Sequence, residues 1–357
     1  MTLMNAEPAE ASPMRPWPNA RGAASQSLLR AGIAAAAAGL FLFLICGLAY
    51  ADASASLSVN VIPSGSPPKA TCQLGNHGAV RGWAHVANGT LLAEDGCLLQ
   101  MSYPSAPAFA TPGTLSDYQN MTNNGHYNTV RYSIFLGCWY DDTCSGAGGG
   151  ETIASIESQL DTAIALAQQT GIYILIDNHN TLPSPDNEGC PDWSADNTIW
   201  SALAPRYAGY TNVIYQIQNE PDWCGTENYT DIAENEDALY QLIRSAAPNT
   251  PIFAWTFLNP SWVFGASGGL LGVLSQAPHI NYSNATVDFH DYSAGDTNFI
   301  ATARGASYPV TMSEYGVCVG SGWDSVLSTM ESLGVSWDCG DGYPDSSPEF
   351  SVTWPKD

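Results

Sequence analysis

The amino-acid sequence predicts an α/β protein with the fold of a (β/α)8 barrel, also called a TIM barrel. From residue 79 onward, short apolar runs rich in β-branched and aromatic residues alternate with helical patterns, which is typical of a parallel sheet. The apolar runs number eight. They occupy a stretch close to the usual barrel size of about 250 residues. We therefore expect a single domain over residues 77–357.

The predicted strands are runs of five to eight mostly apolar residues. They lie at 79–86, 128–135, 172–178, 212–218, 251–257, 285–290, 308–313 and 334–338. The clearest helical patterns lie at 151–169 and 229–247, where apolar residues recur every three or four positions. Gly171 is expected to end the first of these helices. Because only about twenty residues follow the last strand, we expect an abbreviated C-terminal helix.

Residues 1–51 are predicted to be a signal peptide or an N-terminal membrane anchor. The uncharged run 31–49 follows three arginines, and Ala49 and Ala51 occupy the small-residue positions of a signal-peptidase site. Its 19 residues are long for a signal peptide and just long enough to span a bilayer. Cleavage after Ala51 and a retained anchor stay open, and both predict a secreted protein, extracellular or periplasmic. Residues 52–76, rich in Ser, Ala and Pro, are predicted to be a linker.

The charge balance argues against polyanionic partners. The chain carries 34 acidic and 10 basic residues, for a formal net charge of −24. Such a surface repels nucleic acid and anionic lipid. A neutral polymer such as a polysaccharide is indifferent to that charge, so it remains compatible with the composition.

The cysteines agree with export. Apart from Cys46, which lies in the apolar run, the chain has eight cysteines, and an even number in an exported chain predicts disulfides. The sequence has no Cys-x-x-Cys pair, which argues against a zinc ribbon or a redox dithiol. Pairing of neighbouring loops is a hypothesis among about 105 possible connectivities. It pairs Cys138 with Cys144, Cys190 with Cys224, Cys318 with Cys339 and Cys72 with Cys97.

Polar side chains follow the predicted strands at their carboxyl ends, where barrels of this class place their active sites. They are Arg131, His179, Asn219, Glu220, His290, Tyr292, Glu314 and Trp337. Taken singly, an ion-paired arginine, hydrogen-bonded core histidines and a core tryptophan have purely structural explanations. The two carboxylates are harder to explain in that way, because burying them without a task is costly. The whole set predicts an active site.

A facing pair of carboxylates is the minimum equipment for cleaving a glycosidic bond. One is protonated and donates to the leaving oxygen, while the other is ionised and attacks or activates water. We expect Arg131 and Tyr292 to hold Glu314 ionised by charge and hydrogen bonding. Glu220, which follows Asn219, is then the proton donor, with its pKa raised by the nearby negative charge.

The other side chains are expected to support this pair. His179 and His290 orient the reacting groups or bond sugar hydroxyls. Trp337 offers an apolar face on which a pyranose ring can stack. We expect no cofactor and no metal, and we expect a monomer.

The ordered set resembles glycoside hydrolase family 5, the cellulase family, within the clan of retaining (β/α)8 glycosidases. The resemblance covers residues 79–340 and rests on three motifs between Arg131 and Trp337. The motifs are Asn219-Glu220-Pro221, His290-x-Tyr292 and Glu314-Tyr315-Gly316, with His179 preceding them.

This resemblance implies that Glu220 ends the fourth strand as acid/base and that Glu314 ends the seventh as nucleophile. Our strand count places both residues on those strands independently. The resemblance also implies that Asn219 contacts the sugar 2-hydroxyl and that Trp337 forms the floor of the −1 subsite.

The predicted activity is hydrolysis of a β-linked polysaccharide, with endo-β-1,4-glucanase as the first choice and β-mannanase or another β-glucanase as alternatives. Two other classes stay open. One is a non-catalytic carbohydrate-binding barrel. The other is a metal-dependent hydrolase that uses His179, His290, Asp177 and Asp288, because Asp-x-His pairs end two of the predicted strands.

Overall fold

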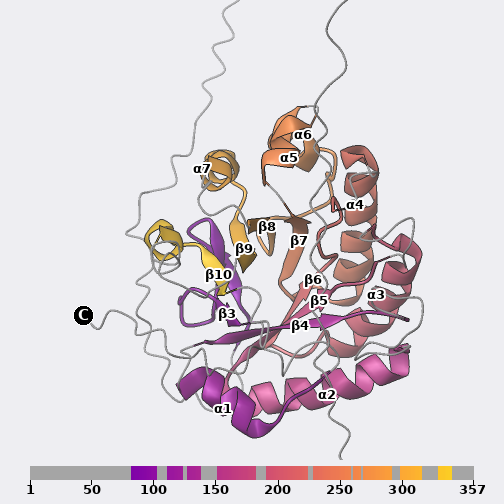
Figure 1. The fold of residues 1–357 in the computed structure, drawn as a ribbon, viewed down its shortest axis with the longest axis vertical. Helices are drawn as coiled ribbons and strands as arrows, with labels where there is room; N and C mark the ends of the chain where they lie inside the picture. The colour runs from indigo at the N-terminus through magenta and orange to yellow at the C-terminus, as the bar shows by residue number, and fades with distance from the viewer. Residues whose placement is uncertain are drawn as a thin grey trace, which may run out of the picture. The chain divides into compact units, whose positions relative to one another are not determined.

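The predicted barrel is present, and it is closed by eight parallel strands (Figure 1). The structure is a computed structural model. It describes residues 82–102, 111–123, 127–137, 151–181, 190–223, 228–258, 260–266, 268–291, 298–315 and 329–339. All of them belong to one unit, Asn60–Asp357.

Around the barrel, each strand pairs in parallel with its neighbours in chain order, and the last strand returns to the first. The strands are β3 (Gln100–Ser102), β4 (Thr129–Ile134), β5 (Tyr173–Asn178), β6 (Val213–Gln216), β7 (Ile252–Phe257), β8 (Ala285–Asp291), β9 (Val310–Tyr315) and β10 (Ser336–Cys339). Seven of them overlap the predicted strands. Glu220 therefore follows the fourth barrel strand and Glu314 lies on the seventh, as expected.

The connections between strands are largely helical. The described helices are α1 (Leu115–Asn123), α2 (Ile153–Thr170), α3 (Trp193–Tyr207), α4 (Tyr229–Ala246), α5 (Pro260–Gly265), α6 (Gly269–Leu274) and α7 (Asn298–Gly305). Helices α2 and α4 confirm the two clearest sequence patterns. Helix α2 starts in a capping box between Thr152 and Ser155 and stops at Gly171, whose φ of 71° is a left-handed conformation that glycine adopts without strain.

The predicted first strand is wrong. In place of a barrel strand at 79–86, His85–Ala87 (β1) pairs antiparallel with Thr90–Leu92 (β2) in a small hairpin outside the barrel. Asn88 and Gly89, with φ values of 53° and 75°, form its turn. Asn-Gly is a strong sequence signal for such a hairpin. The true first strand, β3, has only three residues and is too short to show a pattern.

The apolar core has two layers. One lies between the barrel and the helices and includes Val130, Ile176 and Trp200. The other fills the lower barrel interior, where Leu175 and Phe253 pack with residues of the N-terminal segment such as Leu91. Thr90 ties this segment to the barrel wall, because its hydroxyl donates to Val310 O at 2.7 Å and accepts from Ser336 N at 3.1 Å. One end of the barrel interior is therefore filled by apolar side chains, and the polar side chains lie toward the other end.

Several predictions fall outside the described residues. They are the N-terminal run 31–49, the linker and the abbreviated C-terminal helix. Cys97 and Cys190 are disulfide-bonded, but every predicted pairing includes a cysteine whose side chain lies outside the described part. Among the helices of the described ranges, none combines the length and the apolar character needed to cross a bilayer.

Two acidic residues are buried between α3 and α4. Asp196 and Glu236 have no exposed surface, and neither carboxylate oxygen of Glu236 has a hydrogen-bond partner among the described residues. Burial raises the pKa of Glu236 well above its ordinary value, and the neighbouring Asp196 raises it further. Burial likewise raises the pKa of Asp196. Both groups therefore keep their protons in the folded protein at a pH where the unfolded chain would lose them.

We expect Glu236→Gln to stabilise the protein in a pH-dependent way. The pKa of Glu236 is higher in the folded protein than in the unfolded chain. The contribution of Glu236 to the free energy of unfolding of the wild type is therefore largest below pH 4.5. Above that pH it falls by about 1.4 kcal/mol per pH unit until the folded pKa is reached. The neutral amide removes that loss. Urea unfolding between pH 4 and pH 7 should therefore show a gap between variant and wild type that widens with pH. Glu234→Gln, at an exposed position of the same helix, is the control. A gap that does not depend on pH would contradict this account.

Candidate active site

A layer of hydrogen-bonded polar side chains lies above the apolar floor of the barrel. It is built from residues that alternate along the strands, such as Arg131 and Ser133 on β4 and Asp177 on β5, because every second residue of a strand faces the same side. The members of the layer are fully or almost fully buried. They are Arg131, Ser133, Asp177, His179, Gln216, Asn219, Glu220, Asp288, His290, Ser313 and Glu314.

Arg131 occupies the centre of this layer and is fully buried. Its Nη1 bonds a carboxylate oxygen of Glu314, and its Nη2 lies 2.9 Å from Asp177 Oδ2 and 2.7 Å from Asn219 Oδ1. Nε donates to Gln216 Oε1 at 3.0 Å. Burial raises the pKa of Asp177, but Arg131 and His179 lower it more strongly, to about 2. The guanidinium thus compensates two buried carboxylates and orients two amides.

An irregularity in β9 places Glu314 in the layer. The pairing of β8 with β9 shifts between Asp288, which faces Thr311, and His290, which faces Glu314. One extra residue on β9 breaks the alternation, so the consecutive residues Ser313 and Glu314 both contact interior groups. Bulges of this kind commonly re-aim side chains next to active sites.

Glu220 lies just after β6 in a strained turn. Its φ of 43° is left-handed, which costs a non-glycine residue about 1–3 kcal/mol. Pro221 has a ring that suits the second position of a turn, and Trp223 N closes the turn on Glu220 O at 3.0 Å. Asp222 accepts from Leu258 N at 3.0 Å and from the Tyr229 hydroxyl at 3.1 Å. These contacts hold the turn in its strained shape.

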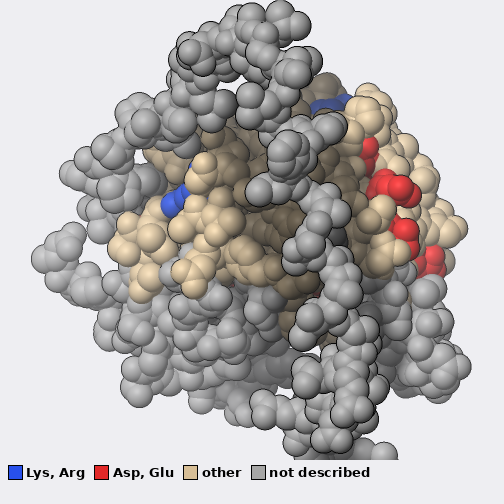
Figure 2. All heavy atoms as spheres, turned by 90° about the horizontal axis from the view of Figure 1, so that it is seen from above, with Lys and Arg blue, Asp and Glu red and all other residues tan. Residues whose placement is uncertain are grey.

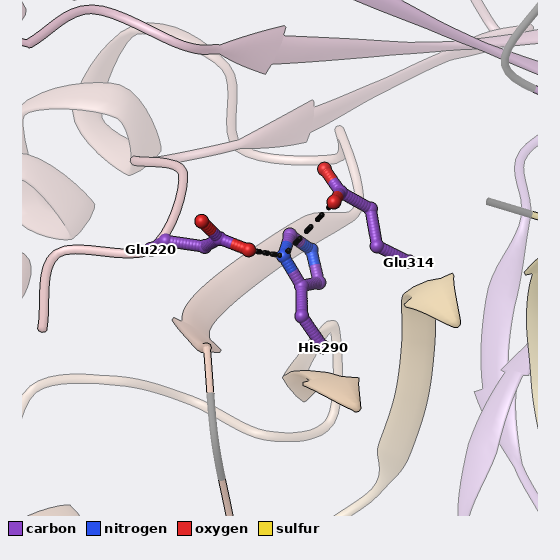
Figure 3. A group of neighbouring side chains, drawn as sticks. All are labelled: Glu220, His290 and Glu314. Atoms are coloured by element: carbon purple, nitrogen blue, oxygen red, sulfur yellow. Dashed lines mark hydrogen bonds and ion pairs between the residues drawn. The ribbon is translucent and has the colours of Figure 1, made fainter. Parts of the chain in front are cut away.

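His290 lies between the two glutamates (Figure 3). Its Nδ1 is 2.5 Å from Glu220 Oε1 and 3.6 Å from Glu314 Oε2. The interacting atoms of the three side chains all lie within 4.8 Å of one another. Burial lowers the pKa of His290 despite the attraction of Glu314. A neutral imidazole therefore lies between the carboxyl group of Glu220, in the turn after β6, and that of Glu314 on β9.

The two glutamates have different surroundings. Burial raises the pKa of Glu220 well above its ordinary value, and the charge of Glu314 raises it further. Glu314 is in direct contact with the guanidinium of Arg131. An arginine at contact distance favours the ionised form of a carboxyl group. The site thus holds one carboxyl group whose pKa is raised and one whose ionised form is favoured by a neighbouring guanidinium.

His179 joins the opposite side of the layer. Its Nδ1 lies 2.8 Å from Asp177 Oδ2, and its Nε2 lies 3.3 Å from the side-chain nitrogen of Asn219. Burial lowers the pKa of His179, but the Asp177 carboxylate outweighs it and the net shift is upward.

One predicted site residue, Trp337, lies away from the glutamates. Trp337 is fully buried in the core between barrel and helices, in register with Met312, and a fully buried indole presents no face on which a sugar can stack. Tyr292 lies outside the described residues.

A sequence model of the family "Cellulase (glycosyl hydrolase family 5)" matches residues 93–338, more than half of the chain. The chain belongs to glycosyl hydrolase family 5. The match spans the barrel strands from β3 to most of β10 and includes both glutamates.

Two named relatives are similar to this chain over part of its length. "Endoglucanase E-5" of Thermobifida fusca is 30% identical over 162 residues, which is 43% of this chain and 32% of the relative. "Endoglucanase CelA" of Streptomyces lividans is 28% identical over 193 residues, 52% of this chain and 38% of the relative. The matched part of this chain thus spans only about a third of the length of these relatives.

Solved structures share the barrel. The catalytic domain of Thermobifida fusca endoglucanase Cel5A (E5) superposes with a TM-score of 0.54 at 22% identity, over 73% of this chain and 85% of that one. A β-mannanase from Thermomonospora fusca gives a TM-score of 0.51 at 18% identity, over 72% and 83%. At these identities the likeness concerns the fold.

Three members of this family 5 site escaped the sequence analysis. Ser133, Gln216 and Ser313 stabilise the charged groups. The available signal is sequence position: Ser133 lies two residues after Arg131 on β4, and Ser313 directly precedes Glu314 on β9. Gln216 is the last residue of β6, three positions before Asn219. Asp177 and Asp288, considered only as metal ligands in the sequence, are held by Arg131 and by Ser313, respectively.

A metal site fits this arrangement poorly. Glu220, His290 and Glu314 form the group of described residues with the donor types and proximity that a cation needs, and it differs from the set proposed from the sequence. However, the Arg131 guanidinium already contacts Glu314, and Glu220 is bonded to His290. A cation would face a buried positive charge and would have to displace that bond.

We expect Arg131→Met to destabilise the protein by about 3–5 kcal/mol, because it leaves Asp177 and Glu314 buried without their counter-ion. Urea denaturation at pH 7 measures the loss. Adding Asp177→Asn should recover part of it, so the double variant is less destabilised than the sum of the single changes. Additive losses would contradict a central role for the guanidinium.

Proposed function

We propose that the chain is a retaining glycosidase that cleaves a β-linked polysaccharide, with β-1,4-glucan as the first choice of substrate. The observation that carries this proposal is the unequal pair of glutamates. Atoms of the two carboxyl groups lie within 4.8 Å of each other. Retaining enzymes have carboxyl groups about 5–5.5 Å apart, and inverting enzymes need roughly 6.5–9.5 Å to admit a water molecule.

Glu314 is the nucleophile in this mechanism. Its contact with Arg131 keeps a lone pair available at the pH of the reaction. The carboxylate lies on the other side of His290 from Glu220 (Figure 3). Attack on the anomeric carbon forms a glycosyl-enzyme ester as the bond to the leaving oxygen breaks. Because Arg131 also holds Asn219, the residue suited to bond the neighbouring sugar hydroxyl is fixed relative to the nucleophile.

Glu220 is the general acid and then the general base. Burial and the charge of Glu314 raise its pKa, so it retains a proton for the leaving oxygen. Forming the ester neutralises Glu314 and removes that charge, so the pKa of Glu220 falls. Glu220 can then take a proton from the water that hydrolyses the ester.

The substrate preference rests on the relatives and on the surface. The relatives with the highest identities given above are named endoglucanases, which favours β-1,4-glucan. Acidic side chains gather along one side of the face seen in Figure 2, so a neutral polymer suits this surface better than an anionic one. Trp262 on α5, which follows β7, is 46% exposed and can stack against a sugar ring.

Export as a monomer with disulfides completes the proposal. Apolar run 31–49, the even number of cysteines outside it and the bonded state of Cys97 and Cys190 support an extracellular or periplasmic location. The alternatives of cleavage after Ala51 and a retained anchor both fit.

We expect Glu314→Gln to abolish turnover while the protein still binds oligosaccharide, because the amide cannot attack but keeps nearly the same shape. Reducing-end assays on carboxymethyl-cellulose, mannan, xylan and laminarin measure turnover and identify the polymer. Calorimetry with an oligosaccharide of the preferred polymer measures binding. Proton NMR of the first wild-type products should show the β-anomer. An α-anomer would refute retention, and a wild type inactive on every polymer would favour a carbohydrate-binding barrel.

We expect activity to survive dialysis against EDTA, because the proposed chemistry uses carboxyl groups alone. The measurement compares initial rates before dialysis, after dialysis and after re-addition of divalent cations. A loss that added metal restores would instead favour the metal-dependent hydrolase.

A further inference from the structure

We propose that Ser313 and Asp288 fix the tautomer of His290 and thereby assign to Glu220 the proton that Glu220 and His290 share. This inference rests on the role of Glu220 as general acid in the proposed function. Ser313 and Asp288 are positioning residues here, because they act on Glu220 only through His290.

The direction of the hydrogen bonds begins at Arg131, which can only donate. Its Nε donates to Gln216 Oε1 at 3.0 Å, and this contact fixes the orientation of the amide. Gln216 Nε2 must then point the other way, where it donates to Thr256 Oγ1 at 2.8 Å and to Ser313 Oγ at 3.2 Å. Ser313 Oγ is therefore an acceptor toward Gln216.

The hydroxyl proton of Ser313 is used in a single hydrogen bond. Ser313 Oγ donates to Asp288 Oδ2, and the backbone N–H of Ser313 donates to Asp288 Oδ1 at 2.9 Å. Thr311 Oγ1 also donates to Asp288 Oδ1, at 3.0 Å. An ionised carboxylate is only an acceptor, so these three donors converge on it, and Gln216 Nε2 is a fourth, at 3.5 Å from Oδ2. With its single proton used, Ser313 Oγ can only accept from its remaining neighbour.

That neighbour is His290 Nε2, at 3.0 Å. A hydroxyl that can only accept requires Nε2 to carry the proton. Burial lowers the pKa of His290, so the ring is neutral and its Nδ1 is an acceptor. The contact of 2.5 Å between Nδ1 and Glu220 Oε1 must then use a proton that belongs to Glu220. The chain from Arg131 thus ends on a protonated general acid.

The charged groups around these two side chains agree with this assignment. His290 faces Glu314 from β9, Arg131 from β4, Asp177 from β5 and Asp288 on its own strand. Glu220 faces Glu314, His179, Arg131 and Asp222. Burial raises the pKa of Asp288 to about 6. Above that pH, Asp288 is ionised and fixes the direction of the hydrogen bonds from Ser313 to His290. Below that pH, protonated Asp288 no longer fixes it.

The test compares Ser313→Ala with the wild type. Without the hydroxyl, the Nε2–H of His290 is left with Asp288 Oδ2 at 3.6 Å, which is beyond hydrogen-bond distance. The proton can then move to Nδ1, which donates to Glu220. A donor to the ionised form of Glu220 lowers its pKa. Ser133→Ala is the matched control, because Ser133 makes the same hydroxyl–carboxylate contact with Asp177 beside the other buried histidine.

The readouts are the tautomer and the pH profile. Nitrogen-15 NMR of histidine-labelled full-length protein at pH 7.5, with His290→Gln to assign one of the six histidines, distinguishes Nε2–H from Nδ1–H. We expect Nε2–H in the wild type and in Ser133→Ala, and Nδ1–H in Ser313→Ala. The alkaline limb of kcat/KM should move to lower pH by about half a unit or more in Ser313→Ala only.

Asp288→Asn provides a second variant, and we expect it to populate Nδ1–H as well. A wild type with Nδ1–H at pH 7.5 would overturn the inference, as would a Ser313→Ala protein that keeps Nε2–H. A uniform loss of activity without a shift of the alkaline limb would show a merely structural role. Failure of the proposed function is separate, because it would appear as full activity of Glu220→Gln, whereas the tautomer is observed without turnover.

Discussion

The buried guanidinium of Arg131 is the interaction on which the rest of this site depends. It is fully buried and joins β4 to groups on β5, β6, β9 and the turn after β6. Removing a guanidinium from water is costly unless its donors are used, and here Asp177, Asn219, Gln216 and Glu314 accept from it. Because its charge and its donors are fixed, it determines which carboxylate is ionised and how the nearby amides point.

The catalytic geometry comes from two departures from regular structure. The bulge in β9 turns two consecutive residues inward, and the left-handed Glu220 brings its carboxyl group to His290. Neither departure is favourable alone, and both are held by contacts with the ends of neighbouring strands. Strain at such positions is tolerated where the surrounding structure over-determines it. The rigid barrel therefore supplies the frame, and the irregular residues supply the function.

Much of this could be predicted from the sequence, because the relevant signals are local. Seven strands show apolar runs long enough to recognise, and Glu220 and Glu314 follow from counting them. The prediction of the first strand is wrong because β3 is too short to show a pattern, whereas the stronger local signal at Asn88-Gly89 is that of a hairpin. Trp337 was predicted to face the site, yet it packs against the helices. The side of the barrel wall on which Trp337 lies depends on the pairing of β10 with β9, where Trp337 is opposite Met312. The sequence of one strand does not determine that pairing.

The tautomer of His290 shows a different limit of sequence analysis. It depends on a hydrogen-bond path through five side chains on four strands, β4, β6, β8 and β9. No residue of the path carries a distinctive sequence signal by itself, and only closure of the barrel brings the five side chains into hydrogen-bond contact. The same closure places two carboxyl groups, far apart in the chain, within reach of one sugar.

Trapping the covalent intermediate tests the central claim most directly. A 2-deoxy-2-fluoro glycoside of the preferred sugar with a good leaving group slows both steps, so the glycosyl-enzyme accumulates. Mass spectrometry of the intact protein and of its peptides then locates the sugar. The account predicts one sugar per chain, attached to Glu314. A label on Glu220 or on any other residue would contradict it.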